Sequence, residues 1–198
     1  MTGRTHHRPM TPGDGFFAES AGGTDPAKVR EAGDLAATIL VRGARESDDP
    51  ALAERVVHLA ENEGLETLAE VWSGAPADTL AGSLWRLFVL RAWVHADPER
   101  VAEEYDAGQR RADVARVVAG VADPPGPDEL RRMVDEVLRG IARGDFAVTL
   151  LRAAAFARVV AAGRATLGAA SHDDIARMLV LSEQLEAAGH GEIAHTLA

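Results

Sequence analysis

The segment from Thr79 to Val94, TLAGSLWRLFVLRAWV, constrains the fold of this chain more than any other part of it. On a helical wheel turned by about 100° per residue, its large apolar side chains surround the whole circumference. A helix that is apolar on every side is either buried in a protein core or spans a membrane. Spanning takes about 20 apolar residues with few charges, whereas Arg86 and Arg91 interrupt a shorter run here. We therefore predict a buried central helix over residues 77–95, against which the other helices pack.

Arg91 is the charge in this helix that is hardest to leave in water. It falls among large apolar residues on the wheel, whereas Arg86 falls on a less hydrophobic side near Gly82 and Ser83. A buried arginine needs a carboxylate or several carbonyl oxygens, because an uncompensated buried charge costs several kcal/mol. We predict a structural ion pair for Arg91. The alternative is a side chain that extends its head group to the surface at the helix end.

The composition of the 198-residue chain favours an all-α fold. Apolar residues make up 46% of the chain and aromatic residues only 5%, so the core must consist mainly of Ala, Leu and Val. Such a core suits closely packed helices better than a β-sandwich, which draws on aromatic and β-branched residues. Alternating patterns typical of strands are missing. The absence of cysteine excludes disulfides and thiolate metal sites.

The net charge of −10 disfavours nucleic acid as a partner, because an acidic protein repels phosphates unless its basic groups are segregated. The pairs Arg110–Arg111 and Arg131–Arg132 are both flanked by carboxylates. Twenty arginines against one lysine, together with abundant Ala and Gly, are typical of a GC-rich genome and predict a bacterial source. No hydrophobic signal sequence is evident, so we expect a cytoplasmic protein that does not contact a membrane.

Helix start and stop signals divide most of the chain. Asp-Pro pairs mark starts, because Asp caps a helix and Pro suits its first turn; they occur at Asp25-Pro26, Asp49-Pro50 and Asp97-Pro98, while Asp123-Pro124 opens a loop. Ser171 and Asp174 resemble a capping box, and glycines at 43, 64, 74, 163 and 189 fall where helices should stop. The predicted helices are 26–44, 50–62, 65–73, 77–95, 98–109, 112–121, 127–143, 145–163 and 172–188.

These signals place eight or nine helices in a single domain over residues 25–198, after an irregular tail over residues 1–24. The tail contains a Phe16–Phe17 pair that can dock on the body or on a second subunit. The last segment, residues 172–198, carries Ile175, Met178, Leu179 and Leu185 in a mostly polar context. It either caps the core or pairs with a second copy of the chain.

Three stretches of sequence resemble one another without gaps. They are GDLAATILV from Gly33, GSLWRLFVL from Gly82 and GDFAVTLLR from Gly144. Their spacings of 49 and 62 residues are unequal, whereas repeat solenoids normally keep a fixed period. Two interpretations stay open: degenerate helical repeats, or three core helices that each start after a turn.

Sequence motifs for catalysis, metal binding and phosphate binding are missing or incomplete. No Gly-x-Ser-x-Gly elbow and no glycine-rich phosphate loop occurs. His58 with Glu54 and Glu61, and Glu192 with His195, have ligand-like spacings, but a di-iron bundle would need more such pairs. A pair of His95 and Asp97 is better explained by helix ends. We therefore predict no catalytic residue, no metal and no cofactor.

Two kinds of site remain. The first is a ligand pocket between helices, in which an arginine orients an acidic ligand; its candidate residues are Trp72, Trp85, Arg86, Arg91, Trp93 and His95. The favoured alternative is that these tryptophans are simply large core residues in a protein with few aromatic residues. The second is an association surface on the last helix. The leading hypothesis is a non-enzymatic interaction or regulatory protein that forms a homodimer, and the alternative is a ligand- or DNA-binding regulator with a pocket near Trp85, Arg91 and Trp93.

Overall fold

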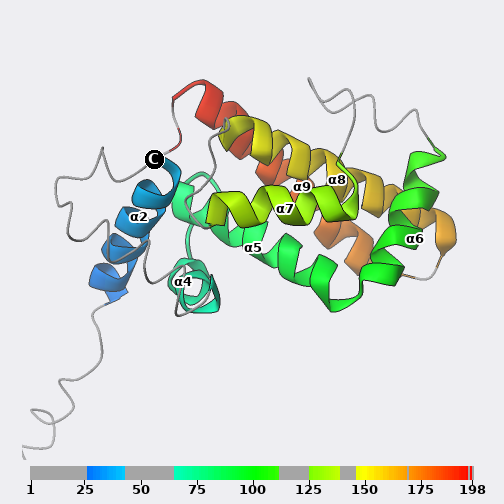
Figure 1. Ribbon diagram of the computed structural model, residues 1–198, viewed down its shortest axis with the longest axis horizontal. Coiled ribbons are helices and arrows are strands. Elements are labelled where there is room, and N and C mark those ends of the chain that lie inside the picture. Colours follow the sequence, from blue (N-terminus) through cyan, green and yellow to red (C-terminus); the bar gives the residue numbers. More distant parts are fainter. Residues whose placement is uncertain are drawn as a thin grey trace, which may run out of the picture.

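The computed structural model describes residues 26–42, 65–111, 125–138, 146–168, 170–195 and 197. All regular secondary structure in these ranges is α-helical, which confirms the predicted fold class for the described part of the chain. The helices, labelled as in Figure 1, are α2 (Pro26–Arg42), α4 (Leu65–Trp72), α5 (Leu80–Ala96), α6 (Pro98–Gln109), α7 (Pro127–Leu138), α8 (Phe146–Leu167) and α9 (His172–Ile193). The predicted tail and the predicted helices at 50–62 and 112–121 lie outside the described residues, so seven helices stand here against the eight or nine predicted for the whole chain.

Two of the predicted helix stops are wrong. Gly163 and Gly189 lie inside α8 and α9, which run several residues further than predicted. A Cβ added to Gly163 would lie only 1.6 Å from the backbone oxygen of Glu104, so this glycine allows close contact between α8 and α6. The residue after α8 is Gly168, with a φ of 65° that favours glycine.

The predicted N-caps at Asp97 and Ser171 are confirmed. The Asp97 carboxylate accepts a hydrogen bond from the backbone N–H of Arg100 at 3.2 Å. The Ser171 hydroxyl oxygen accepts one from the backbone N–H of Asp174 at 3.1 Å. Each cap satisfies an N–H group that has no partner inside its helix. These local contacts set where α6 and α9 begin.

α5 begins at Leu80, three residues later than predicted, because Thr79 is its N-cap. The Thr79 hydroxyl oxygen accepts a hydrogen bond from the backbone N–H of Gly82 at 3.0 Å. The preceding loop lies against this first turn, and a Cβ at Gly82 would be 1.7 Å from the backbone oxygen of Pro76. Only glycine fits there.

The cap of α9 predicts a pH dependence of stability. The Ser171 hydroxyl donates to Asp174 Oδ2 at 2.6 Å and Arg177 donates to Oδ1 at 2.6 Å. The bond from Ser171, followed by that from Arg177, lowers the pKa of Asp174 from 3.8 to about 2. A lowered carboxyl pKa contributes stability that is complete above the unfolded-state pKa and is lost as the pH falls toward the folded-state value. In urea unfolding, the stability difference between wild type and Asp174→Asn should therefore stay constant above about pH 5 and shrink between about pH 4 and 2. A difference that persists unchanged across that interval would contradict this assignment.

α5 is the central helix of the described part of the chain, as predicted. It packs against each of the other six described helices, and it crosses the middle of the molecule in Figure 1. Its inward side is fully buried and consists of Leu80, Leu84, Leu87, Leu90 and Val94. It is not buried on every side, however, because Val89 and Ala92 are exposed. The wheel pattern thus placed the helix correctly but overstated its burial.

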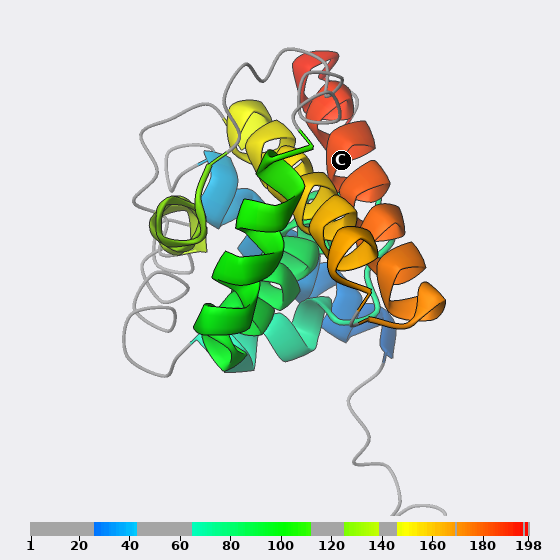
Figure 2. The same cartoon turned by 90° about the vertical axis from the view of Figure 1, so that its right-hand side faces the viewer.

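α8 forms the other half of the core. It packs side by side with α9 as an antiparallel hairpin and crosses α6 on another side (Figures 1 and 2). By length and composition α8 would suffice to cross a membrane, and 78% of its most apolar window is buried inside this protein. Its alanine-rich surface lets both neighbouring helices approach closely.

One ion pair joins the first and last described helices. Both oxygens of the Glu192 carboxylate on α9 accept hydrogen bonds from Arg42 on α2, the Nη2–Oε2 pair at 2.7 Å. Figure 1 shows the end of the chain beside α2. The Glu192 carboxylate, which shares a ligand-like spacing with His195, is therefore held in this pair.

Candidate functional site

The three tryptophans do not line a common pocket. Trp72 is buried and its indole N–H donates to the backbone oxygen of Gly33 at 3.0 Å. Trp85 stacks on Phe88 with ring centroids 5.8 Å apart. Trp93 lies elsewhere, in a groove beside α9. The interpretation of Trp72 and Trp85 as core residues accounts for their positions.

The predicted ion pair of Arg91 is confirmed. Its Nε group donates to Oδ1 of Asp135 on α7. The two side chains are 18% and 22% exposed, so the pair is largely shielded from water. It joins the central helix to α7, whose buried residues Leu130 and Val134 are apolar. Because the pair is satisfied within the fold, Arg91 is a structural residue.

Replacing Arg91 by methionine tests this assignment. We expect Arg91→Met to lower the free energy of unfolding by about 2 kcal/mol, because the Asp135 carboxylate would remain partly buried without its cation. The exposure of the pair keeps this value below that of a fully buried one. Arg132→Met, on an exposed position of α7, is the control. A loss below about 0.5 kcal/mol in urea unfolding would mean that Arg91 only covers the surface.

Arg86 lies on the less hydrophobic side of the helical wheel. Unlike Arg91, it has no carboxylate among its hydrogen-bond acceptors in the described part of the chain. Its Nε donates to Gln184 Oε1 at 2.7 Å and its Nη1 to the backbone oxygen of Gly82 at 2.8 Å. Desolvation lowers the pKa of Arg86, and the charge of Asp78 opposes this effect. Both of these acceptors are neutral, whereas the acceptor of Arg91 is the carboxylate of Asp135. The helical wheel gives the direction in which a side chain leaves its own helix, but it does not show which residues of other helices lie there.

His95 is exposed at the end of α5 and does not converge with the tryptophans. Its pKa is lowered, first by desolvation and then by the nearby cations Arg91 and Arg131, while Asp135 raises it. Asp97, which the sequence analysis considered as an acid–base partner of His95, is the N-cap of α6. Among the described residues no three His, Asp or Glu side chains gather as a metal site; the His58 face lies outside them.

An open groove of about 690 Å³ runs between α5 and α9. Most of its lining side chains are apolar, and its charged residues come from the first turns of α9 and from α8. The lining residues are Val89, Leu90, Trp93, Arg164, Asp173, Asp174, Ala176, Arg177, Met178, Val180, Leu181 and Gln184. Of the six predicted ligand-binding residues, only Trp93 lines this groove. A smaller hollow of about 340 Å³ lies next to Gln184, toward the C-terminal end of α9, and is lined there by Ala187 and Gly191.

The four apolar residues singled out on the last helix divide between two roles. Met178 and Leu185 are buried, so this helix does cap the core, and Ile175 is half-buried. Leu179 is 39% exposed and its neighbour Val180 is 49% exposed. α9 therefore covers the core with one side and presents apolar side chains to solvent on another.

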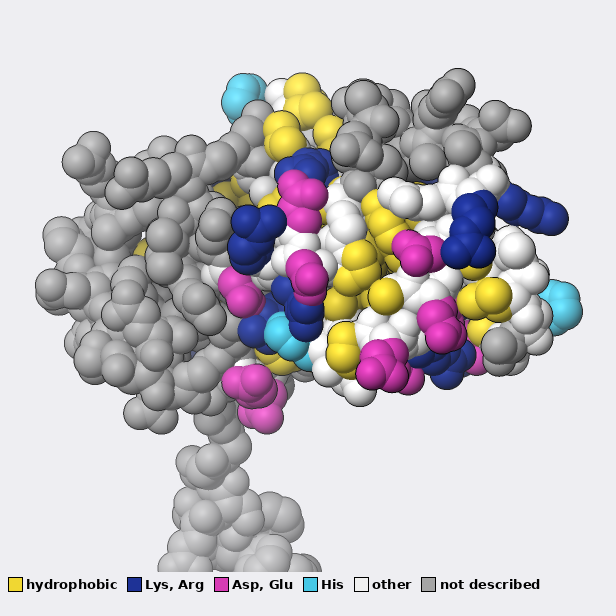
Figure 3. Space-filling view, turned by 45° about the vertical axis from the view of Figure 1, so that its right-hand side comes forward, with side chains coloured by type: hydrophobic (Ala, Val, Ile, Leu, Met, Phe, Trp, Pro, Cys, Tyr) yellow, Lys and Arg dark blue, Asp and Glu magenta, His cyan; other side chains and the backbone are white. Residues whose placement is uncertain are grey.

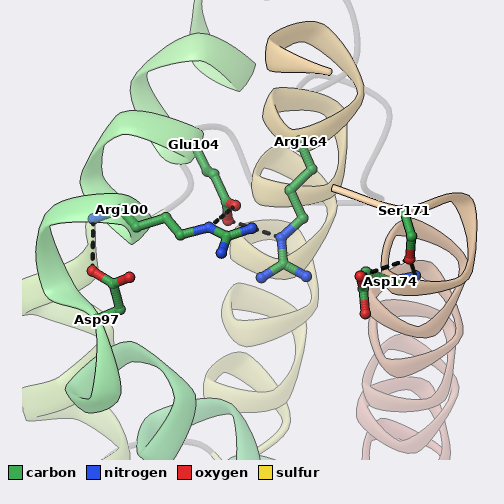
Figure 4. A network of polar contacts seen from close by, with 6 residues as sticks. All are labelled: Asp97, Arg100, Glu104, Arg164, Ser171 and Asp174. Atoms are coloured by element: carbon green, nitrogen blue, oxygen red, sulfur yellow. Dashed lines mark hydrogen bonds and ion pairs between the residues drawn. The ribbon is translucent and has the colours of Figure 1, made fainter. Parts of the chain in front are cut away.

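The end of the groove holds a charged network that the sequence analysis missed. Arg164 on α8 donates from Nε to Glu104 Oε2 at 2.8 Å, and the two side chains are 9% and 3% exposed. Arg100 donates to the other oxygen of Glu104 at 2.9 Å. The guanidinium carbon of Arg164 lies 4.5 Å from the ring centre of Trp93. Figure 4 shows Glu104 between the two arginines. The four-residue spacing of Arg100 and Glu104 could have predicted the ion pair within α6. No sequence pattern indicated that Glu104 also contacts Arg164.

The charged side chains on the described part of the face drawn in Figure 3 are mixed in sign. Acidic and basic groups alternate there, with apolar patches between them. A protein that binds the phosphate backbone of a nucleic acid presents a continuous basic surface. The described part of this face does not present one. Comparisons of the chain with protein-family models, curated proteins and solved structures find no match.

Proposed function

We propose that this protein is a non-enzymatic interaction or regulatory protein that binds a partner helix in the groove between α5 and α9. The observation that carries the proposal is the groove itself, with Val89 and Val180 exposed along it. Exposed apolar side chains gathered in one hollow mark interaction sites. A helix laid in such a groove would remove both from water.

Polar groups at the groove would orient the bound helix. Arg86 holds the side-chain amide of Gln184 by a hydrogen bond of 2.7 Å, so a polar contact point is positioned beside Val180. Asp173 and Arg177 supply charges at the outer end. An apolar centre with a polar rim is the usual composition of an interface between proteins.

Affinity capture with the tagged full chain tests the proposal through a matched pair of variants. Val180→Glu places a charge in the groove, and we expect it to abolish capture of the proteins bound by wild type. Val148→Glu is the control, because Val148 is also 49% exposed and lies on α8 outside the groove. Equal capture by wild type and Val180→Glu would contradict the proposal. Circular dichroism should give the same helix content for all three proteins.

A second candidate function is binding of an amphipathic carboxylate. Arg164 is aligned by Glu104 and lies over Trp93, at the end of an apolar groove. A guanidinium held in this way can bind a carboxylate while the groove covers an apolar chain. Calorimetry with decanoate distinguishes this function: heat of binding that is lost in Arg164→Gln would support it, and no heat with wild type would exclude decanoate as a ligand.

A further inference from the structure

Arg164 carries a hydrogen-bonding edge that the described part of the fold does not use. Its Nε donates to Glu104, and its side chain forms no other hydrogen bond within the described residues. Figure 4 shows its two Nη groups on the side of the guanidinium away from Glu104. Among the described residues no fully buried side-chain nitrogen lacks a partner. The Nη groups therefore reach the one surface that Arg164 still presents, which is the groove that it lines.

The network behind this edge has one positive charge in excess. The two oxygens of Glu104 accept hydrogen bonds from two arginines, Arg164 at 2.8 Å and Arg100 at 2.9 Å. Arg100 is half exposed, so water screens its charge. The side chain of Arg164 is only 9% exposed, and water compensates its charge far less. A second anion at the Nη edge would complete the network.

The carboxylates in the first turn of α9 do not supply that anion. Asp174 accepts hydrogen bonds from the Ser171 hydroxyl and from Arg177. Asp173 is exposed to solvent. Within the described residues, the carboxylate that pairs with Arg164 is that of Glu104. The Nη edge is therefore open to an anion from outside the described part of the chain.

This edge lies at one end of the groove. Arg86 on α5 contacts Gln184 on α9, whereas Trp93, seven residues later on α5, contacts Arg164. Arg164 lies three residues before the end of α8 and thus beside the first turns of α9. On α9 the lining extends from Asp173, near Arg164, to Gln184 at the other end. The 11 positions from 173 to 184 correspond to about 16 Å, or about three turns of a helix.

The shape of the groove fits a helix better than a slim acyl chain. Its two walls are α5 and α9, and each wall presents an exposed valine, Val89 on α5 and Val180 on α9. A helix about 10 Å in diameter contacts both walls at once. Sites for small molecules bury about 70–90% of the ligand, whereas an open groove would leave much of an acyl chain in water.

We propose that the helix bound in this groove is the carboxyl-terminal helix of the partner protein, and that its terminal carboxylate binds the Nη edge of Arg164. This inference rests on the proposed function and names the end of the partner that binds. The two Nη groups form a planar fork that matches the two oxygens of a carboxylate. A terminal residue also presents an apolar side chain from the same Cα, for which Trp93 and Met178 supply an apolar lining.

The same placement fixes the direction of the bound helix. Its carboxyl end lies at Arg164, beside the first turns of α9, and its preceding turns reach toward Gln184. The bound helix is therefore antiparallel to α9. Its last three turns cover the length of the groove.

A peptide selection supplies the probe and tests the terminal carboxylate. Phage that display random peptides of about 12 residues with free carboxyl ends are selected on the full-length chain, and the best binder is synthesised as the acid and as the amide. We expect the acid to bind at least about tenfold more tightly in fluorescence anisotropy, because the amide removes a charge-assisted pair. A selection that enriches no peptide, or equal affinities of acid and amide, would overturn the inference.

A conservative variant tests the role of Arg164. Arg164→Lys keeps a positive charge opposite Glu104 and removes the fork, so the ratio of the acid and amide affinities should fall at least about threefold. Each ratio is measured within one protein, so a small loss of stability cancels. Arg158→Lys is the control, because Arg158 also lies on α8, pairs with Glu186 and does not line the groove. An unchanged ratio in Arg164→Lys would overturn the assignment of Arg164.

Photocrosslinking tests the direction without any change to the chain. Benzoylphenylalanine placed next to the carboxyl end of the selected peptide should label Trp93 or Met178, which lie near Arg164. Placed at the amino end, it should label residues around Gln184. The reverse pattern would overturn the antiparallel arrangement.

The outcomes separate this inference from the proposed function. Peptides that bind equally well as acid and amide, and that no longer bind Val180→Glu, would retain the groove as a site for a helix and overturn the terminal carboxylate. Peptides whose binding Val180→Glu leaves intact would overturn both. Decanoate that binds the wild-type chain more tightly than the selected acid would assign the edge of Arg164 to a small amphipathic carboxylate and overturn the carboxyl-terminal helix.

Discussion

Replacing Gly163 by alanine should lower the free energy of unfolding by about 3 kcal/mol or more. In an ordinary helix this change stabilises by up to about 1 kcal/mol, because glycine loses more backbone freedom on folding than alanine. Here the added Cβ would lie 1.6 Å from the backbone oxygen of Glu104 and 3.0 Å from the backbone nitrogen of Gly108. Backbone atoms cannot turn aside as a flexible side chain can, so α6 and α8 would have to separate.

Urea unfolding of three variants checks the sign of this effect. Gly108 lies on the α6 side of the same helix contact, and a Cβ added there would lie 2.0 Å from the backbone oxygen of Val159. Gly108→Ala should therefore also be strongly destabilising. Gly74→Ala is the control, because nothing lies within 4 Å of its added Cβ; its stability should stay within about 1 kcal/mol of wild type. If Gly163→Ala matched wild type, the close approach of α6 and α8 would be wrong.

Replacing Glu104 by glutamine should lower the free energy of unfolding by about 3 kcal/mol. The substitution keeps the size of the side chain and removes the charge that neutralises Arg164. Both side chains are more than nine-tenths buried. The substitution would remove the anionic partner of Arg164 and leave its contact with the ring of Trp93. Arg100 is half exposed and would return to water, so the cost arises mainly from Arg164.

A double-mutant cycle separates the ion pair from general damage to the core. Glu104→Leu combined with Arg164→Met removes both charges at once, and this variant should be more stable than either single variant. Glu103→Gln, at the neighbouring exposed position, is the control and should change stability by less than about 0.5 kcal/mol. Additive losses in the cycle would show that Glu104 and Arg164 do not stabilise each other.

The sequence predicted the features that depend on neighbouring residues along the chain. The caps at Asp97 and Ser171 are contacts across three residues, so their residue types and spacing were sufficient evidence. The ion pair of Arg91 was predictable in kind, since a buried charge requires a partner, but the identity of Asp135 was not. The wheel contained no information about α7.

The candidate site shows the limits of the same reasoning. Trp93 belongs to the groove, while Arg91 lies in an ion pair with α7. The arginine that meets Trp93 is Arg164, 71 residues further along the chain by their numbers. The repeat hypothesis has a similar limit, because Gly33 lies in the middle of α2 whereas Gly82 lies in the first turn of α5. The first of these stretches therefore does not start after a turn.

The sequence by itself determined the helical class, the positions of most helix starts and the central place of α5, because caps and apolar periodicity act within one or two turns. Only the tertiary structure decided whether Gly163 ends a helix or lets two helices touch, and which carboxylate neutralises Arg164. A helical wheel gives the direction of a side chain about its own axis. The neighbour that it meets depends on how the helices pack, and that packing is set by long-range contacts that no local pattern contains.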